Sequence, residues 1–102
     1  MDKREYEKAL PYSETAIKTD ISSLKAWAYF EIGFCHGELK SCAKAIEAYK
    51  QAIRIDPDYA DVHHGLGQAY LIIGDKNSAL NEYKILKELD IDLANKLFDL
   101  IY

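Results

Sequence analysis

The chain has 102 residues, of which 49% are apolar and 29% are charged, and its formal net charge is −4. This length suits one compact domain, and the interspersed apolar residues argue against a disordered tail. The mild acidic excess disfavours nucleic acid as a partner, because phosphate backbones select clustered Lys and Arg.

The sequence lacks membrane and secretion signals. It has no apolar run of about 18 residues or more, which a membrane-spanning helix would need. Residues 1–5 are charged and lead into no apolar segment, unlike a secretory signal. We therefore expect no membrane partner and a cytoplasmic location.

Similar residues recur with a period of 34 along the chain. Gly33 is followed at this spacing by Gly67, and the same spacing relates three further pairs, Ile32 and Leu66, Ala45 and Ala79, and Tyr49 and Tyr83. A partial earlier copy is shifted by two more residues, which we place in the connection 20–23. Such a period is typical of stacked helical repeats.

The apolar residues of each unit recur at spacings of three and four, which predicts helices. In chain order, the helices are expected at about 2–19, 23–37, 41–55, 58–73, 76–89 and 92–101. Pro11 is expected to kink the first helix or delay its start. The sequence predicts an all-α fold in which short loops force neighbouring helices to pack antiparallel.

The predicted helix ends carry their own signals. Gly74 can take the left-handed conformation that ends a helix, and Asp75 can cap the next one. Ser41 is the expected cap of the helix at 41–55.

Two units match the tetratricopeptide pattern W-x2-L-G-x2-Y, A-x3-F and P. The third unit contains His63-x2-Leu66-Gly67-x2-Tyr70 and Ala79-x3-Tyr83. The second contains Tyr29-x2-Ile32-Gly33-x2-His36, Ala45-x3-Tyr49 and Pro57. The chain therefore resembles the tetratricopeptide-repeat (TPR) family along essentially its whole length, although Lys40 stands where a helix-ending Gly is usual.

The resemblance implies an α-solenoid of antiparallel helix hairpins, forming one TPR-like domain over 1–102. Its parts would be a half repeat at 1–20 with only the second helix, full repeats at 26–59 and 60–93, and a capping helix at 94–102. Gly33 and Gly67 would let the two helices of a hairpin approach closely, with Ala45 and Ala79 as their small partners.

No residue pattern indicates catalysis, a cofactor or a metal site. His63 and His64 are adjacent and diverge on a helix, and no His-x3-His or Cys-x2-Cys pair exists. His36 and His63 occupy aromatic positions of the repeat, so we expect them to pack as rings do. Cys35 and Cys42 fit ordinary core thiols.

The remaining chemical candidates have structural interpretations. Gly65-Leu66-Gly67 is too short for a dinucleotide fingerprint and lies in a predicted helix. The carboxylates Glu5, Glu7, Glu47 and Glu82 are assigned to solvated helix faces. We expect a protein that is not an enzyme.

The resemblance implies a groove lined by the first helix of each hairpin. Its positions in this sequence are Trp27, Phe30, Phe34, Gly37 and Glu38, then Asp61, His64, Gln68, Leu71 and Ile72, then Asn95 and Phe98. The expected function is binding a peptide or amphipathic helix of another protein.

Two alternatives for the aromatic residues stay open. Trp27, Phe30 and Phe34 could pack against residues 1–19, or against a second copy of the chain in a homodimer. The second case is a structural segment that self-associates through its open N-terminal edge.

Some relatives in this family hold chaperone tails through a clamp of Lys, Arg and Asn on groove positions. Here those positions hold Phe30, Phe34, His64 and Gln68. We therefore expect no binding of carboxylate-terminated chaperone tails.

Overall fold

The computed structural model describes residues 3–17 and 21–102. Within those ranges the regular elements are helices and no strand occurs, which confirms the all-α prediction. The elements are α1 (Lys3–Ala16), α2 (Ser22–Glu38), α3 (Cys42–Ile55), α4 (Ala60–Ile72), α5 (Lys76–Leu89) and α6 (Ile91–Ile101). No helix in the described ranges is long and apolar enough to cross a membrane.

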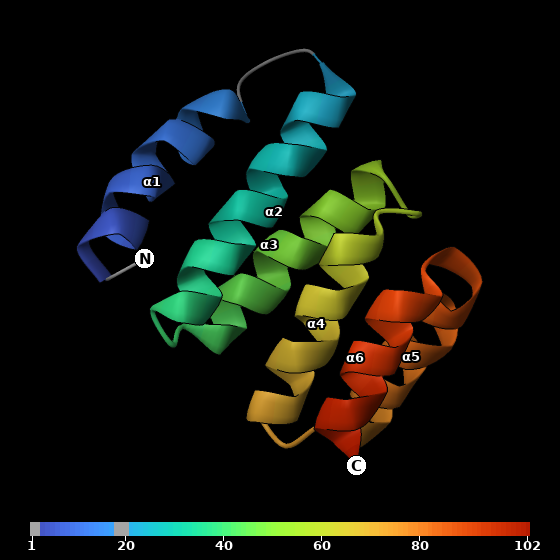
Figure 1. The fold of residues 1–102 in the computed structure, drawn as a ribbon. Coiled ribbons are helices and arrows are strands. Elements are labelled where there is room, and N and C mark those ends of the chain that lie inside the picture. The colour runs from blue at the N-terminus through green and yellow to red at the C-terminus, as the bar shows by residue number, and fades with distance from the viewer. Residues whose placement is uncertain (1–2, 18–20) are drawn as a thin grey trace.

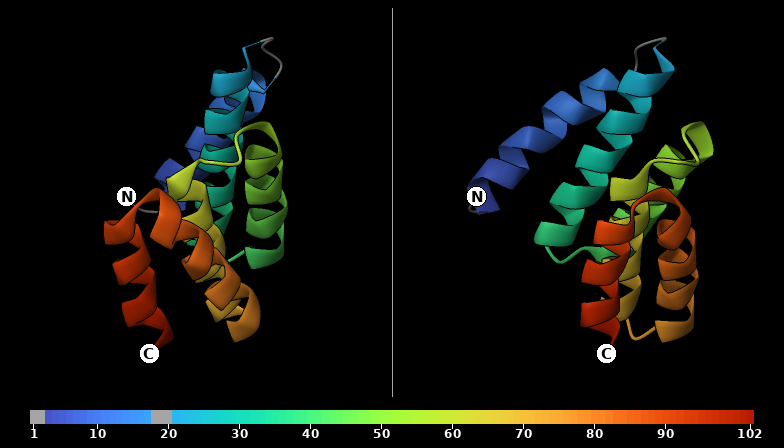
Figure 2. Two further views of the ribbon diagram at one scale, coloured as in Figure 1. Left: turned by 90° about the vertical axis from the view of Figure 1, so that its right-hand side faces the viewer. Right: turned by 45° about the vertical axis from the view of Figure 1, so that its right-hand side comes forward.

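The helices form two layers that place one face of the molecule along α2, α4 and α6. Figure 1 shows these three helices side by side, with α3 and α5 behind them and α1 beside α2 at the N-terminal edge. In the left view of Figure 2, α3 and α6 lie on opposite sides of the molecule. This arrangement agrees with the predicted solenoid of helix hairpins.

Helices α2 and α4 end in the same way, 34 residues apart. At the first end, the N–H of Lys40 donates to the carbonyl of Gly37, and the N–H of Ser41 donates to that of His36. At the second end, Gly74 and Asp75 donate to Leu71 and Tyr70 in the same pattern. Both are Schellman motifs, which require a left-handed residue after the helix.

The left-handed residue is Gly74 at one end and Lys40 at the other, with φ of 83° and 63°. The predicted conformation of Gly74 is confirmed. Lys40 takes the same conformation in spite of its side chain, and this adds strain because a Cβ crowds the following carbonyl.

The predicted caps differ in outcome. The Asp75 carboxylate accepts a hydrogen bond from the N–H of Ser78 at 3.1 Å, so its capping role is confirmed. Ser41 occupies the N-cap position of α3, but its side chain makes no capping hydrogen bond. Its backbone ψ of 65° departs from the extended conformation usual at a cap. Pro11 lies inside α1, so it does not delay the start of the helix.

Tyr49 packs at the centre of the main core. Its side chain is only 5% exposed and belongs to a cluster with Ala45, Val62 and Leu66. A Cβ added to Gly33 would lie 2.6 Å from its ring, and one added to Gly65 would lie 2.7 Å from it. The ring thus lies between α2 and α4, where only glycine leaves enough space.

Gly67 makes its close approach to a different helix from the one predicted. A Cβ at Gly67 would lie 2.5 Å from Cδ2 of Leu97, which belongs to α6 and not to α5 of the same hairpin. Leu97 is fully buried with Leu86 and Ala94 in a second core cluster. The missing side chain of Gly67 therefore serves the docking of the last helix.

Candidate functional site

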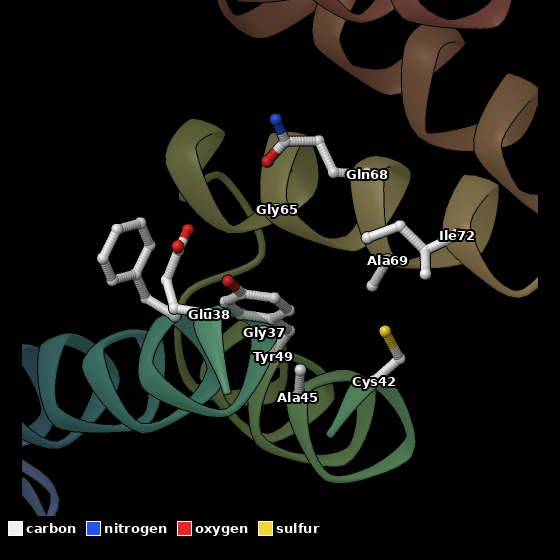
Figure 3. Close-up of a pocket in the computed structure, with 10 residues that line it drawn as sticks. Gly37, Glu38, Cys42, Ala45, Tyr49, Gly65, Gln68, Ala69 and Ile72 are labelled. Carbon is white, nitrogen blue, oxygen red and sulfur yellow. The ribbon is translucent and has the colours of Figure 1, made fainter. Parts of the chain in front are cut away.

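A hollow of about 160 Å³ lies between α2 and α4. Its lining residues are Phe34, Gly37, Glu38, Cys42, Ala45, Tyr49, Gly65, Gln68, Ala69 and Ile72. Figure 3 shows Glu38 and Gln68 on opposite sides, with the Tyr49 ring between them and Cys42 near Ile72. The volume is small against that of typical ligand pockets, about 300–1,000 Å³, so it suits side chains better than a whole cofactor.

A second hollow continues the first toward α6. It has a volume of about 300 Å³ and is lined by Gln68, Leu71, Ile72 and Leu100. Because Gln68 and Ile72 line both hollows, the two form one surface feature across α2, α4 and α6, which we call the groove. Ile72 lies where they meet and is 69% exposed.

Six of the residues predicted for the groove line it. They are Phe34, Gly37, Glu38, Gln68, Leu71 and Ile72. All belong to α2 or α4, and the structure brings the two sets together as the repeat register implies. The other six predicted positions line neither hollow.

Among those six positions, Phe30 packs against the core instead of lining the groove. Its ring centroid lies 5.4 Å from that of Tyr59 and 6.1 Å from that of Tyr49. Phe34 does reach the groove, but it also meets the edge of Tyr6 from α1, with ring centroids 5.8 Å apart. Phe34 thus contacts residues 1–19, which is one of the alternatives left open by the sequence, whereas Phe30 packs against the core.

The remaining predicted positions are dispersed. Trp27, Asp61 and Asn95 are exposed away from the groove. His64 is half-buried, and its Nε2 atom has no hydrogen-bond partner among the described residues. The Phe98 ring contacts those of Tyr83 and Tyr102 in tilted pairs, with centroids 5.6 and 4.9 Å away, and lines neither hollow.

Sequence reasoning missed six residues that line the groove, namely Cys42, Ala45, Tyr49, Gly65, Ala69 and Leu100. Leu100 lies two positions after Phe98, and the repeat register carried into the last helix selected the wrong face of it. A signal was available, because Ala94, Leu97 and Ile101 form the packed stripe of α6 and leave Leu100 beside it. Cys42 is half-buried and lines the first hollow at the start of α3, whereas Cys35 is the buried core thiol that was predicted.

The negative charge of Glu38 affects the pKa values of two tyrosines near the groove. Burial, and after it the Glu38 carboxylate, raises the pKa of Tyr49 above its ordinary value. The pKa of Tyr6 is also raised, by loss of solvent, by the charge of Glu38 and by a hydrogen bond to it. Glu38 therefore lies at the α1 end of the groove and projects a negative field into it.

Glu82 contradicts its assignment to a solvated face. It is 7% exposed, and Oε1 lies 3.2 Å from Nδ1 of the buried His63. His63 replaces an aromatic residue in the core as predicted, and its Nε2 lies 2.7 Å from the carbonyl oxygen of Pro57. The pair ties α4 to α5 and to the loop before α4.

Both ring nitrogens of His63 face acceptors, which favours the charged imidazolium. Burial by itself would lower the pKa of His63, but the hydrogen bonds to Glu82 and Pro57 and the charge of Glu82 outweigh it, so the pKa is raised. The pair has a structural role, because both side chains are buried and line neither hollow of the groove. Across the described ranges, no group of three or more His, Cys, Asp or Glu side chains is placed to hold a metal ion.

Comparison with known proteins agrees with this architecture. Residues 38–74 match a family model described as "TPR repeat". The human protein "Superkiller complex protein 3" is 30% identical over 97% of this chain and 7% of its own length. "Heat shock protein STI1" of Saccharomyces cerevisiae is 28% identical over 91% of this chain and 15% of its own length.

A solved structure extends the comparison to the fold. The "Hsp90 co-chaperone Cns1" of Saccharomyces cerevisiae superposes with a TM-score of 0.85 over 94% of this chain and 32% of that chain, at 17% identity. The chain spans less than a fifth of the length of the curated relatives named above. With its 34-residue period, its six helices and these matches, the chain belongs to the tetratricopeptide-repeat family.

Proposed function

We propose that this chain is a non-catalytic protein-interaction module whose groove binds a peptide or amphipathic helix of a partner protein. One observation carries the proposal. Ile72 joins the two hollows and is 69% exposed, with apolar neighbours on either side. An exposed apolar side chain within a hollowed surface is a typical anchor point for a partner.

The rest of the groove suits a peptide better than a small molecule. A Cβ at Gly37 would meet no atom within 4 Å, so the backbone of α2 borders open space there, and Gln68 offers both a donor and an acceptor. An extended segment or a helix could lay alternate apolar side chains into the two hollows. The name of one relative, "Heat shock protein STI1", supports a chaperone-associated setting as the context that we propose.

The test uses peptides selected on the immobilised full chain from a random display library. The tightest peptide is then titrated by fluorescence anisotropy against wild type, Ile72→Glu and Ile73→Glu. Ile73 is a matched control, since it is the next residue, is 54% exposed and lines neither hollow. We expect Ile72→Glu to weaken binding about tenfold or more, as loss of an apolar anchor does, and Ile73→Glu to leave it unchanged.

Equal effects of the two substitutions would contradict binding in the groove. Failure of the library to yield any peptide that binds would contradict peptide recognition as a whole. Thermal melting of both variants shows whether the fold is retained, and both side chains are exposed enough that little change is expected.

Self-association through the N-terminal edge remains the alternative. It is favoured by Tyr12 of α1, an apolar ring that is 80% exposed. This alternative predicts a dimer by light scattering that dissociates in Tyr12→Ser. A monomer at all concentrations would remove it.

A further inference from the structure

The groove carries a single charge, and that charge is negative. Of the residues that line its two hollows, Glu38 alone is ionised at neutral pH, and none is Lys, Arg or His. Glu38 is exposed, so a partner can reach it. The opposite end, around Leu71, Ile72 and Leu100, is apolar.

Neighbouring carboxylates reinforce this field. After burial, the charges of Glu31 and Glu38 raise the pKa of Cys35 in α2. After burial, Asp61 and Glu31 raise the pKa of Tyr59 at the start of α4. Glu31 therefore adds to the negative charge of Glu38 on α2, and a cation approaching this helix is attracted.

Glu38 makes no ion pair closer than 4.0 Å with a Lys or His of the described residues. Lys3 and Lys40 line a separate hollow with Glu38, and neither Tyr49 nor Gln68 lines that hollow. Two contacts of a Lys or His nitrogen with a carboxylate oxygen within 4.0 Å are found in the described ranges, Lys3 with Glu7 and His63 with Glu82. Neither contact includes Glu38.

We propose that the occupant of the groove is a basic amphipathic segment of a partner protein, with a Lys or Arg against Glu38 and apolar side chains on Ile72 and Leu100. The inference rests on the proposed peptide-binding function and adds the chemistry of the ligand. Opposite charge at one end and apolar contact at the other would also fix the direction in which the segment lies.

The experiment compares the peptides that the display library yields on three immobilised full chains: wild type, Glu38→Lys and Glu88→Lys. Glu88 is a matched control, because it is exposed on α5 and lines neither hollow. We expect wild type and Glu88→Lys to select Lys or Arg beside apolar residues. Glu38→Lys should lose that preference and select Asp or Glu in the same place.

The strongest wild-type peptide is then titrated together with its Lys→Gln counterpart. For an exposed charge pair, the loss on Lys→Gln should be up to about fivefold. The loss should nearly vanish near 1 M salt, where the screening length is about 3 Å. Glu38→Gln should bind both peptides equally.

Each contrary outcome points to a different error. Apolar peptides without basic residues, or the same preference on Glu38→Lys, would overturn the basic partner and leave groove binding intact. Acidic peptides selected on wild type would overturn the basic partner in the same way. Failure to select any peptide would overturn both this inference and the proposed function.

Discussion

Tyr49 shows how single residues set the spacing of this solenoid. Its buried ring occupies the space that side chains at Gly33 and Gly65 would need. The repeat spacing identified Gly33 as a site of close approach, and the structure assigns the approach to this ring. Gly37 offers a contrast on the same helix, because a Cβ there would meet no atom within 4 Å.

We predict that Gly33→Ala lowers the free energy of unfolding by roughly 1–3 kcal/mol, since the Tyr49 ring would have to move. Gly37→Ala should raise it, by up to about 1 kcal/mol, because alanine favours the helix and meets no obstacle. Urea denaturation of the two variants provides the measurement. Equal stability of both would contradict the packing of Tyr49 against α2.

The buried pair of His63 and Glu82 predicts a pH dependence. Since the pKa of His63 is raised above 6.5, the contribution of the charged pair to the free energy of unfolding is fully present below pH 6.5. It is lost as the pH rises through the raised pKa. The pKa values of His36 and His64 are lowered, chiefly by burial, so these residues destabilise the fold on the acid side of 6.5 instead. The two effects fall on different sides of that pH.

Glu82→Gln isolates the His63 contribution. A neutral His63 can donate from Nε2 to Pro57 and accept at Nδ1 from the new amide, so every group remains paired. As the pH rises above 6.5, we predict that the free energy of unfolding of wild type falls by about 1 kcal/mol relative to that of Glu82→Gln, which is the size of one hydrogen bond. Parallel pH profiles of unfolding for the two proteins would contradict a charged pair.

The pairing of Glu82 could have been foreseen in part. Glu82 follows Ala79 by three residues and precedes Leu86 by four, so it shares a face with two fully buried residues. What the sequence could not supply is that His63, on another helix and 19 residues away, would face it. Tertiary partners of this kind depend on the relative placement of helices, which periodicity does not specify.

At the scale of elements, the helix positions followed closely from the sequence. α5 has the predicted bounds, and the ends of α2, α3, α4 and α6 lie within two residues of theirs. The predicted end of α1 falls among residues outside the described ranges. The period, the apolar stripes and the Gly74-Asp75 signal predicted these helices, because all three can be identified in the sequence itself. The face that α6 presents to the groove could not be predicted in this way, because it depends on how Leu97 packs against Gly67.

The two matched Schellman ends allow a reciprocal test. Lys40→Gly should raise the free energy of unfolding by roughly 0.5–1 kcal/mol, because glycine relieves the left-handed strain but gains entropy in the unfolded chain. Gly74→Lys should lower it by a similar amount. If urea denaturation shows that Lys40→Gly is destabilising, the claim that Lys40 adds strain at the end of α2 is wrong.

At the scale of the whole molecule, we predict that the groove does not act as a carboxylate clamp. The positions where a clamp would place cations hold Phe30, Phe34, His64 and Gln68, and the lining of the groove contains Glu38 but no Lys, Arg or His. We predict no micromolar binding of a Glu-Glu-Val-Asp peptide by isothermal titration calorimetry. Glu38→Lys, as a comparison, should bind it more tightly than wild type, and measurable binding by wild type would contradict the account.

The most direct measurement of the central claim, that the groove is the binding surface, is amide chemical-shift mapping. The isotope-labelled chain is titrated with the tightest library peptide. We predict the largest shifts at Gly37, Gln68, Ile72 and Leu100, from the three helices that border the groove. Shifts gathered instead around Glu47 and Glu88 on α3 and α5, with the groove residues unchanged, would contradict it.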